Sequence, residues 1–237
     1  MKITVIKKGA TIKGLDDWKK LGGPKDVNKQ WKKGRSAYEL ANFVINNQKV
    51  FVQKIQSVLE QCGLQSQDFE CEPEAISGLG KGMKRGGSRN HDLLMIGENC
   101  VIAIEAKVSE SFDKPIKDVY NDQKKKSDET RAECLWKFLA EDRGYVKNSE
   151  IGYQLFTATR GTMCSGINAR KNNCIMLVLV FKGDVKKEIN YNSNCKCNEN
   201  DYNNFIETIN ADSKGKIART IENSKINCWI KKENIII

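Results

Sequence analysis

The stretch HDLLMIGENCVIAIEAK, at residues 91–107, indicates the centre of the fold. Two short apolar runs rich in Val, Ile and Leu flank a Gly-Glu-Asn turn, which is typical of a β-hairpin. Because both runs are almost continuously apolar, we expect a central strand pair that is buried on both faces. Asp92 opens the first run and Glu105-Ala-Lys107 closes the second. We therefore expect these polar residues where the buried hairpin emerges at one edge of the core.

The hairpin register decides whether the two carboxylates meet. A two-residue loop at Glu98-Asn99 places Asp92 opposite Glu105, with Cβ atoms roughly 4.5–5.5 Å apart. A two-residue loop one position earlier makes the carboxylates diagonal neighbours on the same face, and only a three-residue loop separates them. Lys107 shares the face of Glu105 because side chains alternate along a strand. Two carboxylates and one ammonium are thus expected to converge.

Converging carboxylates repel each other unless a cation or a proton lies between them. Mg²⁺ is commonly held by one or two carboxylates together with waters and phosphate oxygens. A nearby lysine can stabilise charge on a phosphorane-like transition state or act on the attacking water. The pattern therefore favours a phosphodiesterase. The alternative interpretation is an ordinary hairpin with surface charges at its ends.

Asp92, twelve intervening residues and Glu105-Ala-Lys107 on a hydrophobic hairpin resemble the motif of the PD-(D/E)XK nuclease superfamily. The chain departs from that motif at His91, which stands where the proline would be. The resemblance implies an α/β fold of the restriction-endonuclease-like type, with a central mixed β-sheet flanked by α-helices. It also implies a divalent metal, Mg²⁺ or else Mn²⁺, at Asp92 and Glu105, with Lys107 in the catalytic set.

Two further candidates follow from the resemblance. The helix before the hairpin often supplies an acidic residue to the metal, and Glu39 is the candidate; the Ser36-Ala-Tyr-Glu39 sequence alternatively predicts a capping box. The helix after the second strand often carries a Gln near the scissile phosphate, and Gln154 fits that position. Its amide offers both a donor and an acceptor. The alternative for Gln154 is a polar residue on a partly buried helix.

A closer resemblance joins three motifs in order along the chain. They are GRSAxELA at residues 34–41, the hairpin, and Tyr153-Gln-Leu155 followed by a buried strand. The same order occurs in an uncharacterised bacterial family of nuclease-like proteins and covers roughly residues 16 to 182. That family is assigned by fold rather than by known activity, so the match informs the fold more than the reaction.

A glycine-rich basic segment at residues 77–90 leads directly into Asp92. It lacks the spacing of a P-loop. Four cations of this segment are candidates for clamping a nucleic-acid backbone beside the metal: Lys81, Lys84, Arg85 and Arg89. The alternative is a solvated surface loop.

Composition supports a polyanionic partner. The 237 residues contain 40 Lys and Arg against 30 Asp and Glu, which gives a formal net charge of +10. Such an excess attracts nucleic acid, although the abundance of Lys, Asn and Ile also fits a low-GC coding bias. The nine cysteines lack disulfide spacing, and no stretch reaches the roughly 20 apolar residues of a membrane span. We expect a cytoplasmic protein with reduced thiols and no membrane association.

We expect a single domain over residues 1–237, with a nuclease-like core at about 34–182 and a C-terminal extension at 183–237. Pro73 predicts that the strand at 69–76 is bent or at an edge, with Glu70, Glu72 and Glu74 facing solvent. CIMLVLVF, at residues 174–181, predicts a fully buried strand of a parallel or mixed sheet. The extension is expected to hold a loop at 183–200, a short helix at 201–210 and an outer strand at 225–230.

The function predicted from these observations is metal-dependent hydrolysis of nucleic-acid phosphodiesters, with DNA the favoured substrate. A catalytically silent module that binds nucleic acid or protein on the same fold is one alternative, and a phosphoesterase acting on a small nucleotide is another. A homodimer would be needed to cut both strands of a duplex at once. The sequence contains no recognisable module that reads base sequence.

Overall fold

The computed structural model describes residues 1–80, 83, 87–108, 110–141, 143–144, 146–183 and 189–236. The strands are β1 (Ile3–Lys7), β2 (Ala10–Thr11), β3 (Phe69–Gly78), β4 (Ser88–Gly97), β5 (Cys100–Lys107), β6 (Asn173–Lys182), β7 (Lys216–Ile221) and β8 (Ser224–Ile236). The helices are α1 (Leu15–Gly22), α2 (Val27–Gln30), α3 (Ser36–Ile45), α4 (Gln48–Gln61), α5 (Ile116–Lys124), α6 (Arg131–Ala140), α7 (Tyr153–Asn168) and α8 (Ile189–Thr208), with a 3₁₀ turn, η1 (Val146–Asn148).

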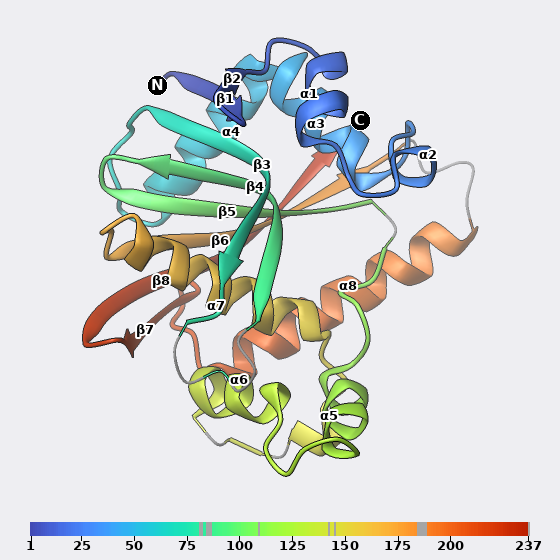
Figure 1. The fold of residues 1–237 in the computed structure, drawn as a ribbon, viewed down its shortest axis with the longest axis vertical. Coiled ribbons are helices and arrows are strands. Elements are labelled where there is room, and N and C mark those ends of the chain that lie inside the picture. Colours follow the sequence, from blue (N-terminus) through green and yellow to red (C-terminus); the bar gives the residue numbers. More distant parts are fainter. Residues whose placement is uncertain are drawn as a thin grey trace.

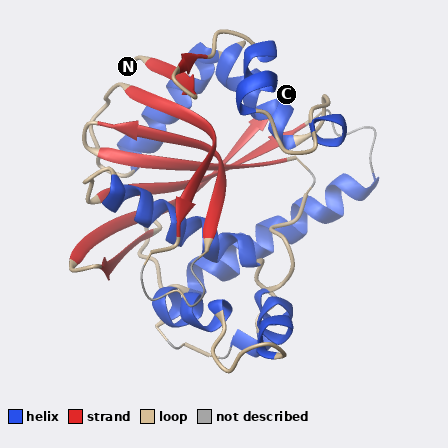
Figure 2. Cartoon of the chain, in the orientation of Figure 1, coloured by secondary structure: helices blue, strands red, loops and turns tan. Residues whose placement is uncertain are grey.

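The strands form one mixed sheet in the order β2-β1-β3-β4-β5-β6-β8-β7. Strands β3, β4 and β5 are antiparallel neighbours, whereas β5, β6 and β8 run parallel. Helices α1, α3 and α4 lie on one side of the sheet and α6, α7 and α8 on the other (Figures 1 and 2). The core accordingly consists of two apolar clusters, one on each face. The prediction of a central mixed sheet flanked by helices is confirmed.

The two most apolar strands predicted from sequence lie at the centre of this sheet. Every residue of β5 is buried, and so are the inner eight residues of β6. The ladder between them runs the whole length of β5. This burial on both faces explains why their sequences are continuously apolar rather than alternating.

The hairpin register follows the first of the three predicted alternatives. Its ladder runs from Leu93–Ile104 to Ile96–Val101, which leaves Glu98-Asn99 as the two-residue loop. The same register would place Asp92 directly opposite Glu105, but the ladder does not extend that far. Strand β4 departs from β5 beyond Leu93 and continues beside β3 alone.

Strand β3 changes its buried face at Glu74. Phe69 and Cys71 pack in the cluster beneath α3 and α4, whereas Ala75 packs in the cluster beneath α7. Residues two apart share a face in a regular strand, so the chain must rotate between them. Glu74 has a positive φ of 47°, which supplies that rotation. The bend predicted from Pro73 is therefore present one residue later, and β3 is internal rather than an edge strand.

Strand β4 turns with its partner. Leu93 and Met95 pack beneath α3 and α4, but His91 lies against Gly161 of α7. The antiparallel pair of β3 and β4 thus has an inner half within the sheet and an outer half that curves toward α7 (Figure 1). The outer half comprises residues 75–78 and 88–91.

The C-terminal part of the chain is built into the sheet. Strand β8 pairs with β6 over ten residues and has β7 on its other side, so the prediction of an outer strand is wrong. The loop expected at 183–200 is also wrong from residue 189 onward, because α8 already begins there. The polar sequence obscured this helix; Phe205, in its later part, packs in the core.

Two further observations concern the helices and the cysteines. In the described part of the chain, no helix has both the length and the apolar character needed to cross a bilayer. The cysteines that the structure describes with their side chains are all free: Cys62, Cys71, Cys100, Cys134, Cys164, Cys174 and Cys228.

Candidate active site

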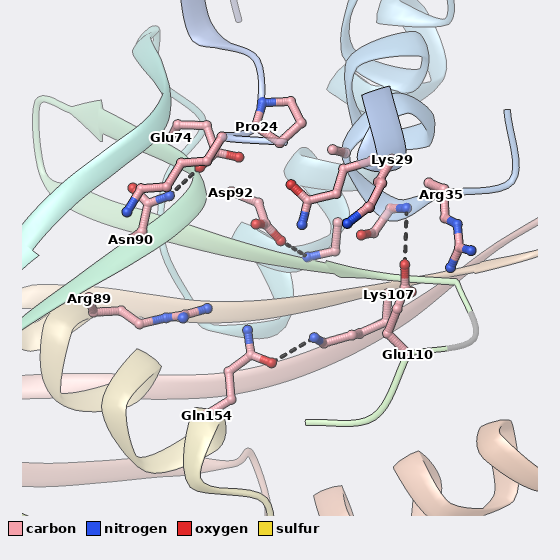
Figure 3. A pocket seen from close by; sticks show the side chains of 15 residues that line it. Pro24, Lys29, Arg35, Glu74, Arg89, Asn90, Asp92, Lys107, Glu110 and Gln154 are labelled. Atoms are coloured by element: carbon pink, nitrogen blue, oxygen red, sulfur yellow. Dashed lines mark hydrogen bonds between the residues drawn. The ribbon is translucent and has the colours of Figure 1, made fainter. Parts of the chain in front are cut away.

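A pocket of about 570 Å³ opens where the bent strand β4, the end of β5 and the first turns of α3 and α7 meet (Figure 3). Three of the five predicted catalytic residues, from three different elements, lie in its wall: Asp92, Lys107 and Gln154. The other lining residues are Pro24, Lys25, Lys29, Gln30, Arg35, Ser36, Ala37, Glu74, Arg89, Asn90, Ala106 and Glu110.

Asp92 lies at the bend of β4. Its Oδ2 accepts a hydrogen bond of 2.7 Å from the Ala106 backbone N–H, so the side chain takes over where backbone pairing with β5 ends. Burial and the negative charge of Glu105 raise the pKa of Asp92 to about 7, against the opposing effects of this hydrogen bond, Lys107 and Arg89. The site therefore favours the neutral form of the Asp92 carboxyl more than water does.

Glu105 lies behind the pocket wall and is 1% exposed. Arg89 binds both of its carboxylate oxygens, with Nε 3.2 Å from Oε1 and Nη2 against Oε2. Gln154 Nε2 donates to Oε2 at 2.8 Å, and His91 Nδ1 lies 3.3 Å from Oε1. Burial alone would raise the pKa of Glu105, but the charge of Arg89 and the contact with His91 outweigh it and lower this pKa to about 2.

His91 connects Glu105 to the outer half of the hairpin. Its Nε2 lies 2.7 Å from Ser77 Oγ, and the ring is completely buried. The proton assignment that satisfies both contacts places the hydrogen on Nδ1, toward Glu105, with the Ser77 hydroxyl donating to Nε2. A Cβ on Gly161 would stand 2.8 Å from Ser77 Oγ and 3.0 Å from His91 Nε2. The absence of a side chain at Gly161 therefore lets α7 approach this pair.

Lys107 and Gln154 form the wall opposite Asp92 (Figure 3). The Lys107 ammonium donates to Gln154 Oε1 at 2.6 Å and lies 5.5 Å from the centre of the Phe112 ring. Because Gln154 Nε2 donates to Glu105, one amide fixes both a cation and an anion of the site. The expected convergence of Asp92, Glu105, Lys107 and Gln154 is thus seen, with Glu105 covered by Arg89.

Glu39 is not brought into the pocket wall. It is 2% exposed, and its Oε1 accepts a hydrogen bond of 2.7 Å from the Gly34 backbone N–H. Helix α3 begins at Ser36 after Arg35, and no side chain caps it by a hydrogen bond. The capping box predicted for Ser36 and Glu39 is therefore wrong in form, although Glu39 does satisfy a backbone donor just before the helix.

The predicted cations are only partly described. Lys81, Lys84 and Arg85 lie outside the described residues, and Arg89 lines the pocket while bound to Glu105. Sequence reasoning missed three further cations that line the pocket: Lys25, Lys29 and Arg35. All three are exposed and belong to the N-terminal segment PKDVNKQWKKGR. The basic character of that segment, which runs into the GRSA motif, is the signal that identifies them.

Glu74 is a second residue that sequence reasoning placed incorrectly. Strand alternation predicts that it faces solvent with Glu70 and Glu72, but the bend of β3 turns it into the pocket wall. Its carboxylate accepts a hydrogen bond from the Asn90 amide. Burial and the charge of Glu105 raise the pKa of Glu74, while Asn90 opposes that shift. Strand alternation could not reveal this position because the alternation itself breaks here.

Comparison with known proteins places the chain in a family without assigning it an activity. The family described as "Domain of unknown function (DUF6946)" matches residues 11–234, almost the whole chain. No curated protein and no solved structure gives a significant match. The chain is therefore a member of the DUF6946 family.

Proposed function

We propose that this pocket is the active site of a divalent-metal-dependent nuclease that hydrolyses phosphodiester bonds, with DNA as the favoured substrate and Mg²⁺ or Mn²⁺ as the cofactor. The observation that carries the proposal is the convergence of Asp92, Lys107 and Gln154 on one pocket, with Glu105 directly behind it. The arrangement agrees with the resemblance to PD-(D/E)XK nucleases, so the proposal extends to a restriction-endonuclease-like fold.

The donor atoms suit a hard cation. Asp92 and Glu105 offer carboxylate oxygens, and the charge of Glu105 contributes to the raised pKa of Asp92, which a cation between them would relieve. Within the described residues, no group of three or more His, Cys, Asp or Glu side chains is arranged for a metal. Two carboxylates completed by water and substrate oxygens are nevertheless a usual environment for Mg²⁺. A bound Mg²⁺ would supply Lewis-acid polarisation of a substrate phosphate.

Lys107 and Gln154 are suited to the charge that develops on the phosphate. The ammonium of Lys107 is held by the amide of Gln154 rather than by a carboxylate, so its charge is not neutralised by that contact. A positioned cation in a partly buried site stabilises developing negative charge without reorganisation. We assign Lys107 to this role and Gln154 to orienting Lys107 and Glu105.

The cations of the pocket support a polyanionic substrate. Lys25, Lys29 and Arg35 line the same pocket as Lys107 and Arg89, and the net charge of +10 acts over a longer range. The number of these cations favours a nucleic-acid strand over a small nucleotide. The free cysteines agree with the proposed cytoplasmic location.

Cleavage assays test the proposal. Plasmid, linear duplex, single-stranded DNA and RNA would each be incubated with Mg²⁺ or Mn²⁺ and the wild type, Lys107→Ala or Lys54→Ala. Lys54 forms an ion pair with Glu233 outside the pocket, so Lys54→Ala removes the same charge elsewhere. We expect wild-type cleavage that chelator abolishes, a loss of at least about 100-fold in Lys107→Ala, and no loss in Lys54→Ala. Equal cleavage by wild type and Lys107→Ala would refute the assignment.

The silent binding module is the second candidate, and one observation favours it. Arg89, Gln154 and His91 occupy the Glu105 carboxylate, so the site is neutralised without a metal. A permanent pair of Arg89 and Glu105 would leave a basic pocket that binds phosphate without cutting it. Binding of DNA that is unaffected by chelator, together with no cleavage of any substrate, would select this candidate.

A further inference from the structure

The most unusual feature of the pocket is that Glu105 has no capacity left for another ligand. A carboxylate offers about four lone-pair positions. Four N–H groups already point at the Glu105 oxygens: two from Arg89, one from Gln154 and one from His91. A metal can therefore bind Glu105 only if one of these donors leaves.

Arg89 is the donor best placed to leave. His91 is completely buried and is fixed on its far side by Ser77, and Gln154 is fixed by Lys107. The Arg89 side chain is 19% exposed and lines the pocket, whereas Glu105 does not. Its long aliphatic stem allows the guanidinium to move without displacement of the strand.

Charge balance explains why Arg89 and a metal exclude each other. Both provide the positive charge that a buried carboxylate requires, and both need the same oxygens. With Arg89 in place, a divalent ion would add two positive charges beside a guanidinium and the Lys107 ammonium. With Arg89 displaced, the ion compensates Asp92 and Glu105 together.

We infer that Arg89 is the resting counter-ion of Glu105, that a divalent cation competes with it for this carboxylate, and that the displaced guanidinium then contacts substrate phosphate in the same pocket. The inference rests on the proposed metal-dependent function. It assigns Arg89 two partners, one in each state of the site. The anion-binding role expected for Arg89 from the sequence would then apply only after the metal has entered.

Calorimetric titration of Mg²⁺ into the metal-free protein tests this competition without any measurement of activity. The proteins are the wild type, Arg89→Ala, Arg89→Lys and Arg35→Ala. Arg35 is the matched control because it is a pocket-lining arginine that is exposed and has its own place in the wall near α3. We expect Arg89→Ala to bind Mg²⁺ at least about tenfold more tightly than the wild type, and Arg35→Ala to change affinity by less than about threefold.

The outcomes separate this inference from the proposed function. Mg²⁺ binding of equal strength in the wild type and Arg89→Ala would overturn the competition but leave the metal site standing. No binding to any of the four proteins would overturn both. Arg89→Ala leaves the buried Glu105 carboxylate without its counter-ion. If this variant folds only in the presence of Mg²⁺, Arg89→Lys decides, because it keeps the charge but loses the bidentate fork. Binding by Arg89→Lys no tighter than wild type would also overturn the competition.

A second titration follows the displaced guanidinium. A short DNA duplex would be added with Ca²⁺ as a metal that need not support cleavage, and binding would be followed by fluorescence anisotropy. Arg89→Ala should weaken DNA binding in the presence of Ca²⁺, and chelator should remove the difference between it and the wild type. An equal loss with and without Ca²⁺ would show that Arg89 contacts phosphate in both states, against the inference.

Discussion

The inner and outer halves of the antiparallel pair of β3 and β4 differ in their surroundings and in their buried side chains. The inner half lies between β1 and β5, and its buried side chains, such as Leu93 and Met95, are apolar. The outer half curves away from β5, and its Ser77 and His91 side chains pack against Gly161 of α7. Glu74 and Asp92 mark the boundary, and both line the pocket. The difference teaches that one strand pair contributes to the hydrophobic core on one side of a bend and to the candidate active site on the other.

The largest expected effect concerns the inner half. Met95 is fully buried, so Met95→Ala should lower the free energy of unfolding by about 2–5 kcal/mol through lost burial and a residual cavity. The neighbouring Ile96, which is 42% exposed, provides the control, and Ile96→Ala should cost less than about 1 kcal/mol. Urea unfolding measures both values. Similar losses in the two variants would contradict the described difference in packing.

A smaller effect, with a defined sign, is expected at the boundary. The pKa of Asp92 is about 7 in the folded state, above its ordinary value of 3.8. Between these two values of pH, the folded state therefore binds more protons than the unfolded state. The free energy of unfolding should therefore fall as pH rises from about 4 to 7. Asp92→Asn removes this titration but keeps an acceptor for the Ala106 N–H.

Urea unfolding of the wild type and Asp92→Asn across that window checks the expectation. The wild type should lose stability relative to the variant by a few kcal/mol at most, since one pKa unit corresponds to about 1.4 kcal/mol. Excess Mg²⁺ should reduce the difference if it binds the ionised carboxylate. Parallel pH profiles without metal would show that Asp92 titrates as it does in the unfolded chain.

The smallest effect is expected where the outer half meets α7. Gly161→Ala would gain about 1 kcal/mol of helix propensity, but its Cβ would stand 2.8 Å from Ser77 Oγ, and overpacking costs about 1–3 kcal/mol. We expect a net loss of about 1 kcal/mol in thermal or urea unfolding. Gly14→Ala, whose Cβ would meet nothing within 4 Å, serves as the control. A stabilised Gly161→Ala variant would mean that Ser77 and His91 can move away from the new Cβ at little cost in free energy.

The sequence predicted the central part of the fold well because its signals there are local. The continuous apolar runs of β5 and β6 are properties of short segments. The loop at Glu98-Asn99 is one of three alternatives that the sequence left open, and the strand pairing selects it. The sequence failed for β8, which was expected to be an outer strand but lies between β6 and β7. Strand order depends on which segments meet across the sheet, and no local pattern encodes that choice.

The candidate site divides in the same way. The sequence by itself determined which residue types would converge, because Asp92, Glu105 and Lys107 are carried by one hairpin, and it suggested Gln154 through the resemblance. Only the tertiary structure decided that Glu74 turns into the pocket, that Lys25, Lys29 and Arg35 complete its wall, and that Arg89 covers Glu105. One physical reason is that a positive φ at Glu74 changes which face of the strand is buried. The other is that the partner of a buried carboxylate depends on which cation lies near it in the folded chain, whatever their separation in the sequence.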